Sequence, residues 1–395
     1  MTVDRHGLGV ERALYLLLAG ARPGDPRLRR LVAGPVDWAT LRALARRDGV
    51  TGELWRRLRE GGATLPEEAA GAWEREARVA DFHLLRLETR LGEVCRVLEG
   101  AGVRPVLIKG AGVAYTVHGG IRRRPMSDVD LLVEPGELER ALEALEETGW
   151  RATAPETEYV AHHHAPPLQD PAGEGVIVEL HHELVPGSPP FAFGADDVRR
   201  RAREVEAPWG SVVVPDPVDQ LLHVAIHFAW SHELRWGAWR AFADVAALVR
   251  GEGSGGWLPQ VRGRASRAGL ERVLGWTLRL AGEVGGVTLP PEGVDMVRRG
   301  APGRPALARH LAHQLLPGPG ASPSVSLGRA AWELAVRPGG SGSAAGASSA
   351  RPWRAGPPGG RPVAATLARR VGRQLARARD WVLYLRTVGR RDRGR

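Results

Sequence analysis

Two aspartates separated by one residue are the first candidates for chemistry in this sequence. Asp128 and Asp130 stand in the apolar run DVDLLV at 128–133. Side chains alternate across a strand, so this run predicts a strand that carries both carboxylates on one face. Neighbouring carboxylates repel each other, and burying them is costly unless a cation neutralises the pair. The pair therefore indicates a Mg²⁺ site of the kind used in phosphoryl transfer, with a solvated strand end or turn as the alternative.

A phosphoryl-transfer site of this kind also needs a third carboxylate, and Glu179 is the best candidate. It lies in the apolar run VIVEL at 176–180, where an acid is anomalous without a cation, and His181 shares its face. Two metal ions about 3.5–4 Å apart could then activate the attacking oxygen and stabilise a pyrophosphate leaving group. We expect Mg²⁺ or Mn²⁺ at Asp128, Asp130 and Glu179.

The segment upstream of the aspartates could hold the phosphates. Lys109 is the only lysine beside 54 arginines, which indicates a position that prefers a compact ammonium to a planar guanidinium. Gly110 and Ala111 follow where an apolar strand ends and a short helix opens, so free backbone N–H groups could receive triphosphate oxygens. Arg124 is the arginine closest to the acidic pair and could add a phosphate contact. An ordinary surface lysine is the alternative for Lys109.

Histidines concentrate in the middle of the chain, and their roles stay open at this stage. His223 and His227 lie four residues apart on one expected helix face, which is a spacing that fits a metal pair. Their apolar neighbours favour a buried structural or acceptor-site role instead, with Asp244 on the next helix as a candidate partner. His163 and His164 either face a nucleotide cleft or pack within a loop.

The elements that must position these residues form an α/β unit between two helical regions. Helical spacing of apolar residues dominates positions 1–100 and returns from 216 to about 316. A helix is expected behind Pro135, and the turn formers DPAGEG at 170–175 predict a hairpin. Strands are expected at 103–109, 128–133, 176–184 and 211–214.

We divide the chain accordingly into an N-terminal helical region, an α/β core, a C-terminal helical region, a Gly/Pro/Ser/Ala-rich linker and a basic amphipathic helix. Their bounds are 1–100, 101–215, 216–320, 321–362 and 363–395.

The net charge of +10 comes from the end of the chain. The last 45 residues hold 13 arginines and two aspartates, which leaves 42 basic and 43 acidic residues in positions 1–350. The body is nearly neutral, so nucleic acid is not an expected partner for it. The basic C-terminal helix could dock on the body, bind an acidic partner or nucleic acid, or lie on an anionic membrane surface.

Composition excludes several other classes of protein. The single cysteine, Cys95, rules out an intrachain disulfide framework and a cysteine-based zinc site. No apolar run approaches the roughly 20 residues of a membrane span, so no transmembrane segment is expected. The N-terminus lacks the residue succession of a signal peptide, which predicts a cytoplasmic protein.

Taken together, these segments resemble the polymerase-β-like nucleotidyltransferase superfamily, and within it a bacterial group described as uncharacterised nucleotidyltransferases. The resemblance covers roughly residues 35–315. The segments that carry it are LIKGAGVAY at 107–115, RPMSDVDLLV at 124–133, HHAPPL at 163–168, VELHHEL at 178–184, and LLHVAIHFA with a later FADVAALV.

The resemblance implies an α+β fold: a nucleotidyltransferase core, with a mixed sheet and flanking helices, between N- and C-terminal helical regions. It assigns catalysis and metal binding to Asp128, Asp130 and Glu179. It assigns nucleotide binding to Lys109, Gly110, Ala111, Arg124 and Ser127. The superfamily's usual Gly-Ser phosphate loop is here Gly110-Ala111, so a serine hydroxyl contact is missing.

The implied reaction is Mg²⁺-dependent transfer of a nucleoside monophosphate from NTP, with ATP as the expected donor, and release of pyrophosphate. The acceptor is unknown and could be a small molecule, a peptide or a protein. Glu179 stands where many relatives have Asp, and could serve as a metal ligand, as a general base, or as both. The alternative is a noncatalytic nucleotide-binding or regulatory protein that retains the fold.

Overall fold

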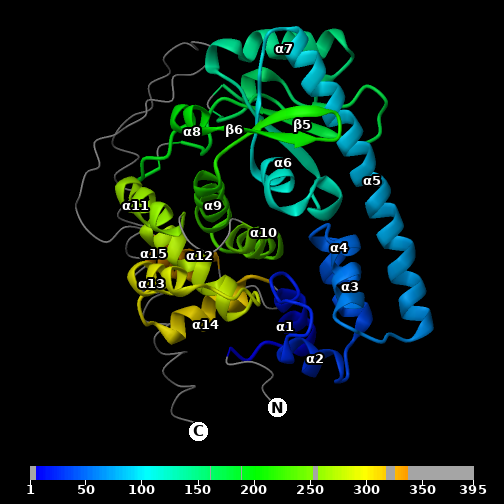
Figure 1. The fold of residues 1–395 in the computed structure, drawn as a ribbon, viewed down its shortest axis with the longest axis vertical. Coiled ribbons are helices and arrows are strands. Elements are labelled where there is room, and N and C mark those ends of the chain that lie inside the picture. The colour runs from blue at the N-terminus through cyan, green and yellow to red at the C-terminus, as the bar shows by residue number, and fades with distance from the viewer. Residues whose placement is uncertain (1–5, 161, 188, 252–256, 317–324, 337–395) are drawn as a thin grey trace.

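A computed structural model describes residues 6–160, 162–187, 189–251, 257–316 and 325–336 of the chain. It confirms the expected α+β fold, because a mixed sheet of seven strands is flanked by many helices. Figure 1 shows the sheet in the upper half of the molecule, with the C-terminal helices gathered below it. The described residues thus form a sheet layer and a helical layer, and α6 lies between them.

The N-terminal region is helical, as expected. Its helices are α1 (Val10–Leu17), α2 (Pro26–Val32), α3 (Trp38–Arg47), α4 (Thr51–Glu60) and α5 (Glu67–Gly100). The carboxylates of Asp25 and Asp37 accept backbone N–H bonds at the starts of α2 and α3, which fixes where these helices begin. Helix α5 has 34 residues and runs along one side of the molecule, from α3 and α4 to the sheet.

The strands follow one another in the sheet in the order β3-β4-β5-β2-β1-β7-β6. Neighbours β2 and β5, and β1 and β7, run parallel, and the other pairs are antiparallel. The strands are β1 (Val106–Leu107), β2 (Asp128–Leu132), β3 (Arg151–Ala152), β4 (Leu168–Gln169), β5 (Ile177–His181), β6 (Arg203–Ala207) and β7 (Gly210–Val214).

The hairpin predicted at 170–175 joins β4 to β5. Asp170 closes it, because its carboxylate accepts from the backbone N–H groups of Ala172, Glu174 and Val176 at 3.0 Å each. This turn sets the antiparallel register of β4 against β5, which in turn presents β5 to β2.

Alternation along β2 and β5 separates an apolar face from a polar one. Val129 and Leu131 of β2, with Val178 and Leu180 of β5, are buried in one hydrophobic cluster with α5 and α7 (Leu138–Glu147). The acids occupy the opposite face, as the period of two requires. The short helices between the strands are α6 (Lys109–Val113), η1 (Ala114–His118), η2 (Ile121–Arg123), η3 (Pro135–Glu137), η4 (Glu156–Glu158) and α8 (Ala195–Arg201).

The C-terminal helices share a second hydrophobic cluster with the N-terminal ones. Tyr15 of α1 and Trp239 of α10 lie with ring centroids 6.5 Å apart, so the two helical regions pack as one layer. The helices are α9 (Pro217–Ala225), η5 (Ile226–Ser231), α10 (Ala238–Gly251), α11 (Leu258–Ala268), α12 (Glu271–Glu283), α13 (Pro291–Gly300), α14 (Pro305–Gln314) and α15 (Val325–Val336).

Strand β3 was not expected from the sequence, and helix α15 and strand β6 also differ from the expectation. Helix α15 lies within the segment expected as a linker, and the Trp332 indole on it is buried and donates to the Ala229 carbonyl at 2.5 Å. Strand β6 was not expected because its residues, REVEA, are charged and mostly exposed at the edge of the sheet. The rest of the expected linker and the whole expected basic helix at 363–395 lie outside the described residues.

Candidate active site

A cleft separates the sheet from the C-terminal helices, and two different surfaces line it. It encloses about 970 Å³ of empty space, including its opening to solvent. We call the first surface the sheet wall; it comprises Lys109, Gly110, Arg124, Ser127, Asp128 and Asp130. We call the second the helical wall; it comprises His223, His227, His232, Trp236, Arg240 and Asp244.

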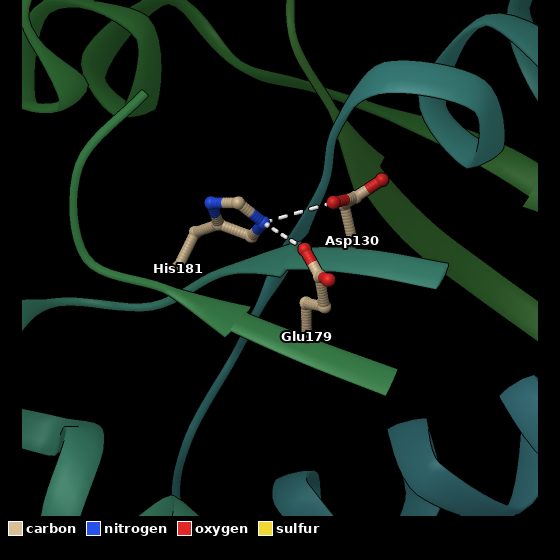
Figure 2. Close-up of side chains that lie close together, drawn as sticks. All are labelled: Asp130, Glu179 and His181. Carbon is tan, nitrogen blue, oxygen red and sulfur yellow. Dashed lines mark hydrogen bonds and ion pairs between the residues drawn. The ribbon is translucent and has the colours of Figure 1, made fainter. Parts of the chain in front are cut away.

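Asp130 of the sheet wall forms a compact group with Glu179 and His181, which do not themselves line the cleft (Figure 2). Parallel pairing of β2 with β5 places Asp130 directly beside Glu179. The His181 Nε2 atom lies 2.8 Å from Asp130 Oδ1 and 3.3 Å from Glu179 Oε2. One donor atom from each residue lies within 4.8 Å of the others, which is close enough for all three to hold a single metal ion.

Lys109 places its ammonium against this same group. Its Nζ atom lies 2.5 Å from Asp130 Oδ1 and 3.9 Å from Glu179 Oε2. Burial would by itself lower the pKa of Lys109, but Asp130, Glu179 and Asp128 outweigh it, so the pKa is raised. Lys109 also has a φ of 47°, a left-handed conformation that is unfavourable for a residue other than glycine. Such strain is typical of functional sites.

Asp128 and Asp130 both face the cleft, but their environments differ. Burial raises the pKa of Asp130, yet Lys109 and His181 outweigh it, so the pKa is held well below its usual value. The pKa of Asp128 is raised by burial and by repulsion from Asp130 and Glu179. The nearest polar partner of Asp128 is the Ser127 hydroxyl, which donates to its Oδ1 at 3.1 Å. Among the described residues, Asp128 is therefore the acid of the pair that forms no ion pair.

Arg124, expected as a phosphate contact, is already occupied by Asp244. The guanidinium donates to both Asp244 oxygens, from Nη2 at 2.6 Å and from Nε at 3.1 Å. His118 Nε2 lies 3.0 Å from the same carboxylate, and these partners outweigh burial and lower the pKa of Asp244 to about 2. The prediction that Asp244 pairs with His223 or His227 is therefore wrong.

The close approach of Arg124 also explains the glycine at position 110. A Cβ atom on Gly110 would lie 2.7 Å from Arg124 Nη1, so a larger residue would push the guanidinium away. The expected loop residues Gly110 and Ala111 are both buried within α6, and only Gly110 of the two lines the cleft.

The histidines of the helical wall are neutral. Burial, with a smaller effect of Lys109, lowers the pKa of His223 to about 3. Burial likewise lowers the pKa of His227 and His232, whose ring centroids lie 4.2 Å apart. The Nε2 atom of His223 has no hydrogen-bond partner among the described residues. Donor groups of His223 and His227 belong to no three-residue metal cluster in the described part of the chain.

His163 and His164 lie next to His181 and do not line the cleft. Their ring centroids are 5.1 and 5.0 Å from that of His181. The backbone carbonyl of His163 accepts from the N–H groups of His182 and Glu183 at 3.1 Å each. Of the two alternatives left open for this pair, the geometry favours loop packing, and that packing supports the His181 ring.

Sequence reasoning missed three side chains of the helical wall, the first of which is His232. Trp236 precedes α10, and Arg240 lies within it. Both belong to the segment SHELRWGAWR, which carries no recognisable motif. Two consecutive residues there, Glu233 and Leu234, have φ values of 53° and 58°, and η5 just before them is a π-helix. Such irregular backbone is frequent at functional sites, but no sequence pattern indicated it here.

The mixed sheet, with an acidic strand beside a second acid, is consistent with an α+β fold of the nucleotidyltransferase class. The chain belongs to the family described as uncharacterised nucleotidyltransferase, whose model matches residues 34–286. The family supports nucleotidyl transfer as the general kind of activity. No curated protein matches the chain. Among the described helices, none is both long enough and apolar enough to cross a bilayer.

Proposed function

We propose that this protein transfers a nucleoside monophosphate from an NTP to the hydroxyl group of an acceptor. The observation that carries the proposal is the pairing of Asp130 with Glu179 in adjacent parallel strands, next to Lys109 and at the edge of the cleft. Two carboxylates and one ammonium at a cleft suit a ligand that brings its own charges, namely phosphates with a divalent cation.

Asp128, Asp130 and Glu179 are the residues that we propose to hold Mg²⁺ or Mn²⁺. Their oxygen atoms match the ligand preference of these hard cations. If His181 carries a proton on Nε2, it donates that proton to the Asp130 and Glu179 carboxylates and leaves their other oxygens for the cation. When bound, the cation neutralises phosphate charge and makes the acceptor hydroxyl more acidic.

The proposed reaction forms one bond to phosphorus and breaks another. The acceptor oxygen attacks the α-phosphorus of the NTP, and the bond from that phosphorus to the bridging oxygen of the β-phosphate breaks, which releases pyrophosphate. The hydroxyl proton passes to a carboxylate, for which Glu179 is the proposed recipient if it is not itself a metal ligand. Lys109, once Asp130 binds a cation, is available to a phosphate oxygen.

We also propose ATP as the donor, a small molecule, a peptide or a protein as the acceptor, and a cytoplasmic location. Ser127, exposed beside Asp128, and the backbone of Gly110 and Ala111 are proposed nucleotide contacts.

A second candidate function is noncatalytic nucleotide binding. Its supporting observation is that Lys109 already neutralises Asp130 at 2.5 Å, so this carboxylate needs no metal ion to be stable. A protein that keeps the fold only for regulation would bind NTP here without transferring it.

Label transfer separates the two candidates. Purified protein is incubated with each NTP labelled in the α-phosphate, with Mg²⁺ or Mn²⁺, and with extract of the host cell. We expect label on an acceptor, reduced at least about 100-fold in Asp130→Asn. Glu134→Gln, an exposed acid two residues beyond the end of β2, is the control and should transfer label normally. NTP binding that requires Asp130, without any label transfer, would support the noncatalytic function.

A further inference from the structure

Arg240 is the arginine of the helical wall. Within the described residues it makes no hydrogen bond, ion pair or cation–π contact, although its side chain lines the cleft and is only partly exposed. Arg124, across the same cleft, is bound by both oxygens of Asp244. Of these two arginines, only Arg240 has its donors free for a ligand.

An arginine in this position is costly to the protein without a ligand. Burial, and then repulsion from Arg124, lower the pKa of Arg240, whereas Asp128 and Asp48 act in the opposite direction. Neither acid is within ion-pair distance of the guanidinium, so the charge is not compensated locally. An unpaired, partly buried cation is costly, and an anionic ligand would compensate its charge.

The position of Arg240 indicates which anion it binds. Asp128 is the acid of the sheet wall whose charge acts on Arg240, both residues line the cleft, and Asp128 forms no ion pair among the described residues. A chain of phosphates with Mg²⁺ satisfies both, because the metal ion pairs with the carboxylate and the phosphate oxygens pair with the guanidinium. The planar fork of arginine matches two oxygens of one phosphate.

We propose that Arg240 binds the polyphosphate of the nucleotide from the helical wall, opposite Asp128. The inference rests on the proposed function, and it adds a phosphate contact from outside the acidic core. It moves the role expected for Arg124 to a residue 116 positions later in the chain. Arg124 then serves to hold the two walls together through Asp244.

Calorimetric titration with inorganic tripolyphosphate and Mg²⁺ tests this inference without turnover. We expect Arg240→Gln to weaken binding about 10- to 100-fold, the range for a charge-assisted pair of hydrogen bonds. Arg235→Gln is the matched control, because Arg235 lies five residues earlier and does not line the cleft. The Arg240→Gln protein without ligand should melt no lower than the wild type, since the variant removes an uncompensated charge.

Three outcomes would overturn the inference: no binding of tripolyphosphate by the wild type, wild-type affinity in Arg240→Gln, or an equal loss in Arg235→Gln. The proposed function can fail separately. Binding that depends on Arg240, without Asp130-dependent label transfer, would retain the inference and reject the transfer reaction. Label transfer with an unchanged KM for NTP in Arg240→Gln would support the transfer reaction and reject the role of Arg240.

Discussion

The two walls of the cleft differ in how their charged side chains are paired. On the sheet wall, Asp130 is bound by Lys109 and His181, and Arg124 is bound by Asp244 from across the cleft. On the helical wall, the histidines are neutral and Arg240 has no partner among the described residues. The charges of the sheet wall are thus largely compensated by side chains, whereas that of Arg240 on the helical wall is not. A wall with open donors is where a ligand gains most from polar contacts.

The largest effect is expected where the walls meet, at Asp244. Asp244→Asn leaves the buried Arg124 guanidinium and His118 without their carboxylate. Breaking a buried ion pair from one side costs about 3–5 kcal/mol, so the free energy of unfolding should fall by that amount in urea denaturation. This result would show that the two walls are joined by charge.

Asp295 provides the control, because it forms a comparable aspartate–arginine pair with Arg299 at the surface. Asp295→Asn should leave the urea midpoint nearly unchanged. Equal midpoints for Asp244→Asn and Asp295→Asn would contradict the difference drawn between a compensated interior and an exposed pair.

The next effect concerns the ammonium of the sheet wall. Lys109 contacts Asp130 within a buried group, where a planar guanidinium cannot replace a compact ammonium without moving its neighbours. We expect Lys109→Arg to lower kcat for label transfer about 10- to 100-fold, because small displacements of catalytic groups have effects of that size. Wild-type rates in this variant would show that the position needs only a positive charge.

The smallest effect is the pH dependence of stability contributed by the helical wall. The folded-state pKa of His223 is about 3, far below the value of about 6.5 in an unfolded chain. The unfolded protein therefore binds more protons between these values, and stability is lost as the pH falls from about 6.5 towards 3. Lowering the pH from 7 to 5 should cost about 1–2 kcal/mol through this histidine.

His223→Gln should flatten the dependence of the melting temperature on pH over that range. His83→Gln, on the partly exposed surface of α5, is the matched control and should leave the slope unchanged. Identical slopes for His223→Gln and the wild type would show that His223 is not held neutral by the helical wall.

The sequence could predict contacts of this site between residues that are close along the chain, but not contacts between residues that are far apart along it. The alternation in DVDLLV and VIVEL was enough to place the acids on one face of the sheet, because it depends only on local periodicity. The pairing of Arg124 with Asp244 spans 120 residues, so no local pattern could indicate it. Arg124 was expected as a phosphate contact because it is close to the acidic pair in the sequence, and no local pattern marked Arg240.

Prediction of the fold from local sequence was limited in the same way. The order of helical regions and the strands with apolar residues could be predicted, whereas β6 is formed by polar residues that pair with β7 at the edge of the sheet. Helix α15 is short and lies beside a Gly- and Pro-rich tract, and only its packing against the C-terminal helices, through Trp332, shows that it belongs to the core. Tertiary contacts decided both elements.

The π-helix η5 makes the geometry of the helical wall sensitive to the length of the chain. An α-helix advances by about 100° for each residue, and a π-helix accommodates one residue more than a regular turn. Deleting a single residue between Ile226 and Ser231 would restore a regular turn and rotate the downstream segment, including Trp236 and Arg240. Insertions and deletions in this segment are therefore a means of redesigning the opposite side of the cleft while the acidic strands keep their register.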